Sequence, residues 1–170
     1  MPSRDDVVRW SKLEAALGAA FRSLSISTAE DARPWVRFAC QCVLHTPCED
    51  GGTPLAAAAQ PSFRTAFQLA ERWCDGEALS LDDLREARAV ACKDVETLTP
   101  RLTGAAAARW SVLHAVEAAL HAAAATPESL RQTVEAVEGA ARYARQAAGA
   151  RSVEAAQYQK DLFDKTVAAR

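Results

Sequence analysis

Alanine is the commonest apolar residue of this chain, and the apolar positions recur at helical spacing. The longest such run, residues 105–125, reads AAAARWSVLHAVEAALHAAAA. Alanine has the highest helix propensity, whereas the β-branched residues that favour strands are scattered and no apolar/polar alternation persists. The sequence therefore predicts an all-α fold. Because alanine-lined faces let helices approach closely, we expect a compact stack or bundle of about six to seven helices, mostly antiparallel neighbours.

Caps, prolines and glycines divide the chain into helical segments. Residues 49–60, EDGGTPLAAAAQ, predict a loop with at most one alanine-rich turn. The first expected helix begins after Ser3, as a cap, and ends at Phe21, and the second begins after Asp31, as a cap, and is stopped by Pro47. The third runs from Pro61 to Gly76, a left-handed cap, and the fourth from Ser80 through Leu98 to Pro100. The last three run from Thr103 or Gly104 to Ala125, from Thr126-Pro127 to Ala148, and from Ser152 toward the C-terminus.

Length and charge limit the classes of function. At 170 residues the chain fits one helical domain, 1–170, in which 1–30 form an N-terminal helix and its connection. The net charge is -2, so no nucleic-acid partner is expected. No signal peptide or membrane span is recognisable, which predicts a cytoplasmic protein with no membrane partner and with its five cysteines reduced.

The stretch CQCVLHTPC, residues 40–48, contains three cysteines and a histidine and is the first candidate metal site. On a helix, Cys40 and Cys42 point about 200° apart and cannot hold one ion from the same face. Cys42 and His45 share a face, but a three-ligand set with Cys48 needs the helix to unwind and a fourth ligand to arrive from elsewhere. The favoured interpretation is that these cysteines are small core residues.

The segment HAVEAALH is the second candidate, because His114, Glu117 and His121 fall within an arc of about 60° on one helix. This face could hold a metal or transfer a proton. Its spacing matches neither Glu-x-x-His nor His-Glu-x-x-His. Histidines between alanine helices more often bond a neighbour and fix the helix register, so we expect no metal and no cofactor.

Carboxylates at the expected helix ends form the third candidate, a surface that binds a partner. Local capping and the helix dipole already explain acidic residues at such places. If the loops gather at one end of the stack, the same side chains form a negative rim that would steer a basic protein. The candidate partner-binding residues are Glu49, Asp50, Asp75, Glu77, Asp82 and Asp83.

Other chemistry is not indicated. Trp10, Trp35, Trp73 and Trp110 lie on apolar helical stripes, which favours core packing. There is no glycine-rich phosphate loop, nucleophile elbow or dinucleotide motif, so we do not expect an enzyme.

Three segments resemble a known family. They are RFACQCVLH (37–45), PSFRTAFQLAERWCDGE (61–77) and WSVLHAVEAALH (110–121), followed by Glu154, Tyr158-Gln159 and Leu162. In their order they resemble the small all-helical immunity proteins of the Imm-5 type from bacterial polymorphic-toxin loci. The resemblance covers residues 31–170. Tyr158 stands where that family has tryptophan.

The resemblance implies an inhibitor that binds a cognate protein toxin and masks or distorts its active site. If the toxin is a nuclease with a basic cleft, the acidic residues above would make the contact. The alternative is a helical adaptor or oligomeric scaffold, in which the heptad-like segment 127–148 and the last helix pair with another copy; a homodimer stays open under either interpretation. A metal-dependent enzyme that uses Cys42, His45, His114 or His121 is the least favoured alternative.

Overall fold

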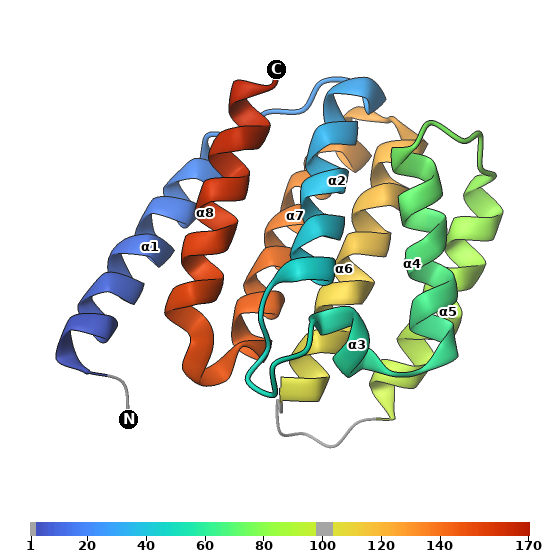
Figure 1. The fold of residues 1–170 in the computed structure, drawn as a ribbon. Helices are drawn as coiled ribbons and strands as arrows, with labels where there is room; N and C mark the ends of the chain where they lie inside the picture. The colour runs from blue at the N-terminus through green and yellow to red at the C-terminus, as the bar shows by residue number, and fades with distance from the viewer. Residues whose placement is uncertain (1–2, 98–103) are drawn as a thin grey trace.

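A computed structural model describes residues 3–97 and 104–170, which form an all-α fold without strands (Figure 1). These residues form eight α-helices and one 3-10 turn: α1 (Arg4–Arg22), α2 (Ala29–His45), α3 (Pro54–Ala58), α4 (Pro61–Cys74), α5 (Leu81–Glu96), α6 (Gly104–Ala124), α7 (Pro127–Ala147), η1 (Gly149–Arg151) and α8 (Ser152–Ala168). The helical class is confirmed. The expected number of six to seven is too low, because the stretch that we interpreted as a loop contains α3.

Several expected helix ends are confirmed by their hydrogen bonds. The Ser3, Ser80 and Thr126 hydroxyls each accept from the backbone N–H three residues on, which satisfies a donor that the helix cannot use. Gly76, which directly follows the α4 C-cap residue Asp75, has a φ of 88° in the left-handed region that favours glycine.

One helix start was predicted incorrectly, and some predicted boundaries cannot be compared. The cap of α2 is Thr28, whose side chain accepts from the N–H of Asp31; Asp31 lies in the first turn instead of capping it. The predicted boundary residues Leu98, Pro100 and Thr103 lie outside the described part of the chain.

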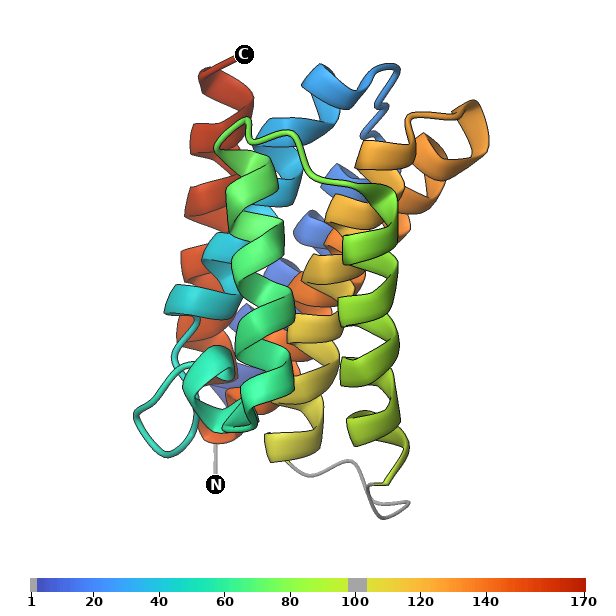
Figure 2. The same ribbon diagram turned by 90° about the vertical axis from the view of Figure 1, so that its right-hand side faces the viewer.

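The long α6 and α7 form an antiparallel hairpin at the centre of the molecule (Figures 1 and 2). α2 packs on both of them, α3, α4 and α5 pack against α6, and α8 packs against α2 and α7. Apart from the short α3, helices that follow one another along the chain run antiparallel, as expected. Figure 1 also shows parallel neighbours, because α1 and α8 run in the same direction, as do α2 and α7.

The core has an alanine part and an aromatic part. Alanines of α6 and α7 are buried along their seam, as in Ala115, Ala119 and Ala140, and allow close approach of the two helices. Phe21 of α1 and Phe163 of α8 pack edge to face with ring centroids 5.2 Å apart. Their cluster is completed by Trp35 and Phe38 of α2. The aromatic cluster therefore joins the first and last helices to the centre.

Candidate functional site

Two cysteines of the first candidate metal site, Cys40 and Cys42, are core residues of α2, and Cys48 is buried in the segment that follows this helix. Cys42 is fully buried, Cys40 nearly so, and His45 is exposed. Burial raises the pKa of the Cys42 thiol well above its usual range, and it raises that of Cys48 to about 11. These thiols are therefore held in the protonated form, which binds metals poorly. In residues 3–97 and 104–170, no three His, Cys, Asp or Glu side chains come together as a metal site.

The second candidate, on α6, is held in an ion-pair and stacking array. His114 Nδ1 lies 3.1 Å from Glu117 Oε2, and Arg88 of α5 donates from Nε to Glu117 Oε1 at 2.9 Å. The His114 ring stacks on Tyr143 of α7, with centroids 5.2 Å apart and planes 9° apart. His121 lies close enough to feel the charges of Glu117 and Arg88, and burial is the main cause that lowers its pKa. The array fixes α5 and α7 against α6. His114 thus bonds a neighbouring residue and helps to fix the register of the helices, which is the role that the sequence favoured.

The six acidic candidates do not form one rim, because the loops that carry them lie at opposite ends of the bundle. Glu49 and Asp50 follow the C-terminal end of α2, close to the end of α7, where the Glu49 N–H donates to Ala147 O at 3.4 Å. The other four lie where α4 ends and α5 begins (Figure 1); they are Asp75, Glu77, Asp82 and Asp83. The structure therefore brings four of the six residues to one end.

Arginines accompany the carboxylates at the α4–α5 end. Arg37 of α2 contacts Asp75 at 3.1 Å, and Arg85 contacts Asp82 at the same distance. Arg72 pairs with Glu77, which lowers the pKa of that carboxyl. These pairs are largely exposed to water and weak, so they leave the surface charged with both signs present.

Beside these residues lies a groove between α4 and α5, here called the acidic groove. Its volume is about 440 Å³. Leu69, Leu79 and the exposed Val90 supply apolar lining, and Arg72, Asp83 and Glu86 supply charges. A groove with an apolar floor and a charged edge has the composition of a protein-recognition surface.

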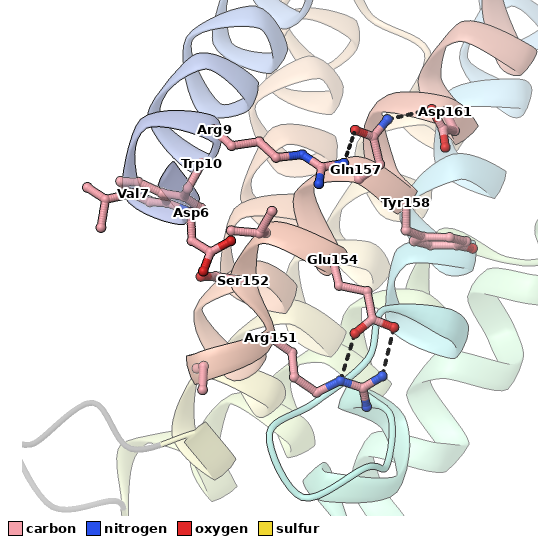
Figure 3. Close-up of a pocket in the computed structure, with 13 residues that line it drawn as sticks. Asp6, Val7, Arg9, Trp10, Arg151, Ser152, Glu154, Gln157, Tyr158 and Asp161 are labelled. Carbon is pink, nitrogen blue, oxygen red and sulfur yellow. Dashed lines mark hydrogen bonds and ion pairs between the residues drawn. The ribbon is translucent and has the colours of Figure 1, made fainter. Parts of the chain in front are cut away.

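A larger groove, of about 1120 Å³, separates the N-terminal half of α1 from the start of α8 (Figure 3). We call it the α1–α8 groove. Asp6, Val7, Arg9 and Trp10 line it from α1, and Ser152, Val153, Glu154, Gln157, Tyr158 and Asp161 line it from α8. One hydrogen bond crosses it, from Arg9 Nη2 to Gln157 Oε1 at 3.4 Å, and the Arg151–Glu154 ion pair lies along its α8 side.

This groove was not predicted from the sequence, because helical spacing places Trp10 on the apolar stripe and hence in the core. Trp10 is 39% exposed and Val7 is 51% exposed, whereas Trp35 and Trp73 are buried and Trp110 is partly buried, as expected. The apolar stripe of α1 reaches the core at Leu13, which is partly buried, and is fully buried only at Leu17 and Phe21. Periodicity identifies the stripe, but it contains no signal for how far along the helix a neighbour covers it.

The heptad-like face of α7, which the scaffold interpretation assigned to a second copy, is occupied within the chain. Leu130, Val137, Ala141 and Ala144 are buried, and α7 packs most extensively on α6. Gln159, part of the segment that carries the family resemblance, is also buried: its amide donates to Thr46 Oγ1 at 3.1 Å and to Ala141 O at 3.0 Å. These residues hold the helices together.

Across the two described ranges, no helix combines the length and the apolar character needed to cross a bilayer. Comparison of the chain with protein-family models, curated proteins and solved structures gave no significant match.

Proposed function

We propose that the protein is a non-catalytic immunity protein that binds a cognate toxin, and that the acidic groove makes the contact. The observation that carries this proposal is the position of four sequence-predicted carboxylates, Asp75, Glu77, Asp82 and Asp83, where α4 ends and α5 begins. One of them, Asp83, lines the groove with the apolar floor. An inhibitor of this kind needs a rigid scaffold, an apolar anchor site and a charged edge, and it needs no chemistry of its own.

The charge at this end also favours a basic partner. Asp75, Glu77 and Asp82 are each paired with an arginine, and Asp83 and Glu86 add further negative charge at the groove. Such a field accelerates encounter with a positively charged cleft, such as that of a nuclease, and the effect weakens with added salt. The groove floor then supplies the contacts that slow dissociation.

The experiment begins with a tagged pull-down from the native organism. Each captured protein is expressed without this chain and together with it. We expect one captured protein to stop growth when expressed without this chain and to be silenced by co-expression. Recovery of harmless partners only would contradict the proposal and favour a helical adaptor or scaffold.

The surface is tested with the double variant Glu77→Lys, Glu86→Lys. We expect its association rate with the captured toxin to fall about tenfold at low salt and to lose most of its salt dependence. The matched control is Glu128→Lys, Glu135→Lys, which reverses two exposed charges on α7. If both variants associate at the wild-type rate, the contact lies on another surface.

A further inference from the structure

The N-terminal half of α1 has apolar side chains that the rest of the described chain covers only in part. Val7, Val8 and Trp10 are 51%, 48% and 39% exposed, and all of residues 3–12 are exposed. In Figure 1, α1 and α8 are furthest apart at their N-terminal ends, and the α1–α8 groove lies between them there. Exposed apolar side chains beside a groove of this size are typical of an interaction surface.

The four α1 residues that line the groove are arranged in two edges. With about 100° between successive residues, Asp6 and Arg9 lie toward one edge of the groove-facing side, and Val7 and Trp10 lie toward the other. Lys12 lies on the opposite side of the helix and does not line the groove. The helix therefore presents one charged edge and one apolar edge.

This arrangement is complementary to itself. When two copies of α1 pack antiparallel about a two-fold axis, like edges meet. With the axis between positions 7 and 8, Asp6 of each copy lies level with Arg9 of the other, which gives two reciprocal ion pairs along one edge. Along the other edge, Val7 of each copy meets Trp10 of the other. A partner with only one sign of charge, such as nucleic acid or an anionic membrane, would leave half of these charges unpaired.

We propose that a second copy of this chain occupies the α1–α8 groove, and that the protein forms a two-fold symmetric dimer through antiparallel α1 helices. The α1 helix of the second copy enters the open end of the groove, where Val153 and Tyr158 of α8 add apolar surface. The dimer leaves the acidic groove uncovered, because that groove lies between α4 and α5, on the other side of the bundle from α1 (Figure 1).

The first test is the mass of the full chain in solution, measured by light scattering at several concentrations. We expect twice the 18.2 kDa of one chain at roughly 100 µM, where a dimer with a micromolar dissociation constant is nearly complete. Arg9→Glu and Trp10→Asp should each raise the dimer dissociation constant at least tenfold. The matched controls are Lys12→Glu, the same charge reversal outside the groove, and Val90→Asp, a similarly exposed apolar residue on α5.

The second test uses the reciprocal ion pairs. Asp6→Lys and Arg9→Glu each place like charges opposite each other in a homodimer, whereas a mixture of the two variants restores both pairs. We expect each variant to be monomeric when it is the only chain present and their equimolar mixture to be dimeric. Asp6 also completes the capping box of α1 with Ser3, so circular dichroism must show that Asp6→Lys keeps its helix content. If the helix frays, the comparison of Arg9→Glu with Lys12→Glu decides the question.

A wild-type chain that stays monomeric at roughly 100 µM would overturn the dimer. Equal dimerisation of Arg9→Glu and Lys12→Glu would overturn this interface, as would a mixture of well-folded variants that stays monomeric. Whether the protein dimerises through α1 is a separate question from whether it binds a toxin. Loss of dimerisation leaves toxin capture through the acidic groove intact, and the Glu77→Lys, Glu86→Lys variant leaves the mass of the dimer unchanged.

Discussion

The guanidinium of Arg145, on α7, is buried and forms a two-point ion pair with the carboxylate of Glu14, on α1. Its Nη2 lies 3.1 Å from Glu14 Oε2, and its Nε donates to Oε1. A third donor, Nη1, bonds to Gln159 Oε1 of α8 at 2.5 Å. One buried side chain therefore holds α1 and α8 to the central hairpin, on the core side of the α1–α8 groove.

Glu14→Gln should destabilise the protein by about 3 kcal/mol, because it leaves the buried Arg145 charge without its partner. Urea denaturation measures the loss. Hydrogen exchange should locate it, with faster exchange of α1 amides than of α6 amides. Asp5→Asn, an exposed change on the same helix, is the control. Equal stability of Glu14→Gln and wild type would mean that Arg145 is neutralised in another way.

Two glycine substitutions should have opposite effects. A Cβ on Gly139 of α7 would lie 2.9 Å from Cγ and Nδ1 of the His114 ring, which Tyr143 holds by stacking. Gly139→Ala should therefore cost about 1–3 kcal/mol despite the better helix propensity of alanine. Gly18→Ala meets only the flexible end of Arg22, at 3.3 Å, and should stabilise α1 by up to about 1 kcal/mol. Denaturation of both variants tests the prediction, and a neutral Gly139→Ala would contradict it.

The ion pair of Glu117 should make stability depend on acidic pH. Burial opposes ionisation of this carboxyl, but the contacts with His114 and Arg88 outweigh it and hold its pKa below the ordinary 4.5. A group whose pKa is lower in the folded state stabilises the fold above its unfolded pKa and loses this contribution as the pH falls through the folded pKa.

Glu117→Gln should accordingly be less stable than wild type by about 1–2 kcal/mol at pH 7. The difference should shrink as the pH falls below 4.5. Thermal unfolding across this range measures it, with Glu135→Gln as a control for the loss of an exposed carboxylate. A difference that stays constant with pH would show that the Glu117 contacts do not favour its ionised form.

The five thiols should differ in reactivity. Cys92 is partly exposed, whereas Cys40, Cys42, Cys48 and Cys74 are buried. We therefore expect iodoacetamide to alkylate Cys92 first in the folded protein and the other four only after unfolding, because burial both blocks access and keeps the thiols protonated. Mass spectrometry of the folded and unfolded chains measures this order. Equal labelling rates in the folded protein would contradict the observed burial.

Local signals predicted most of the helix boundaries, and one such signal was missed. Thr126-Pro127 was recognised as a helix start, and the same pair occurs at Thr53-Pro54, where Thr53 caps α3. A helix of five residues is too short to show periodicity, so only the cap and the proline could have indicated it.

Long-range features could not be read from the sequence in the same way. Arg145 and Glu14 are 131 positions apart, and no local pattern pairs them or predicts that an arginine is buried. The placement of Glu49 and Asp75 at opposite ends of the bundle could have been predicted from the sequence, because successive antiparallel helices place alternate loops at opposite ends.

The pairing of α1 with α8 also has a consequence for the order in which the fold assembles. The α6–α7 hairpin brings together segments that are neighbours in sequence, so closing it costs little chain entropy. Joining α1 to α8 closes nearly the whole chain into a loop and gains fewer contacts. We therefore expect the central hairpin to form early, while α1 docks late and is released first under stress. A surface on α1 is thus completed only after the rest of the molecule has folded.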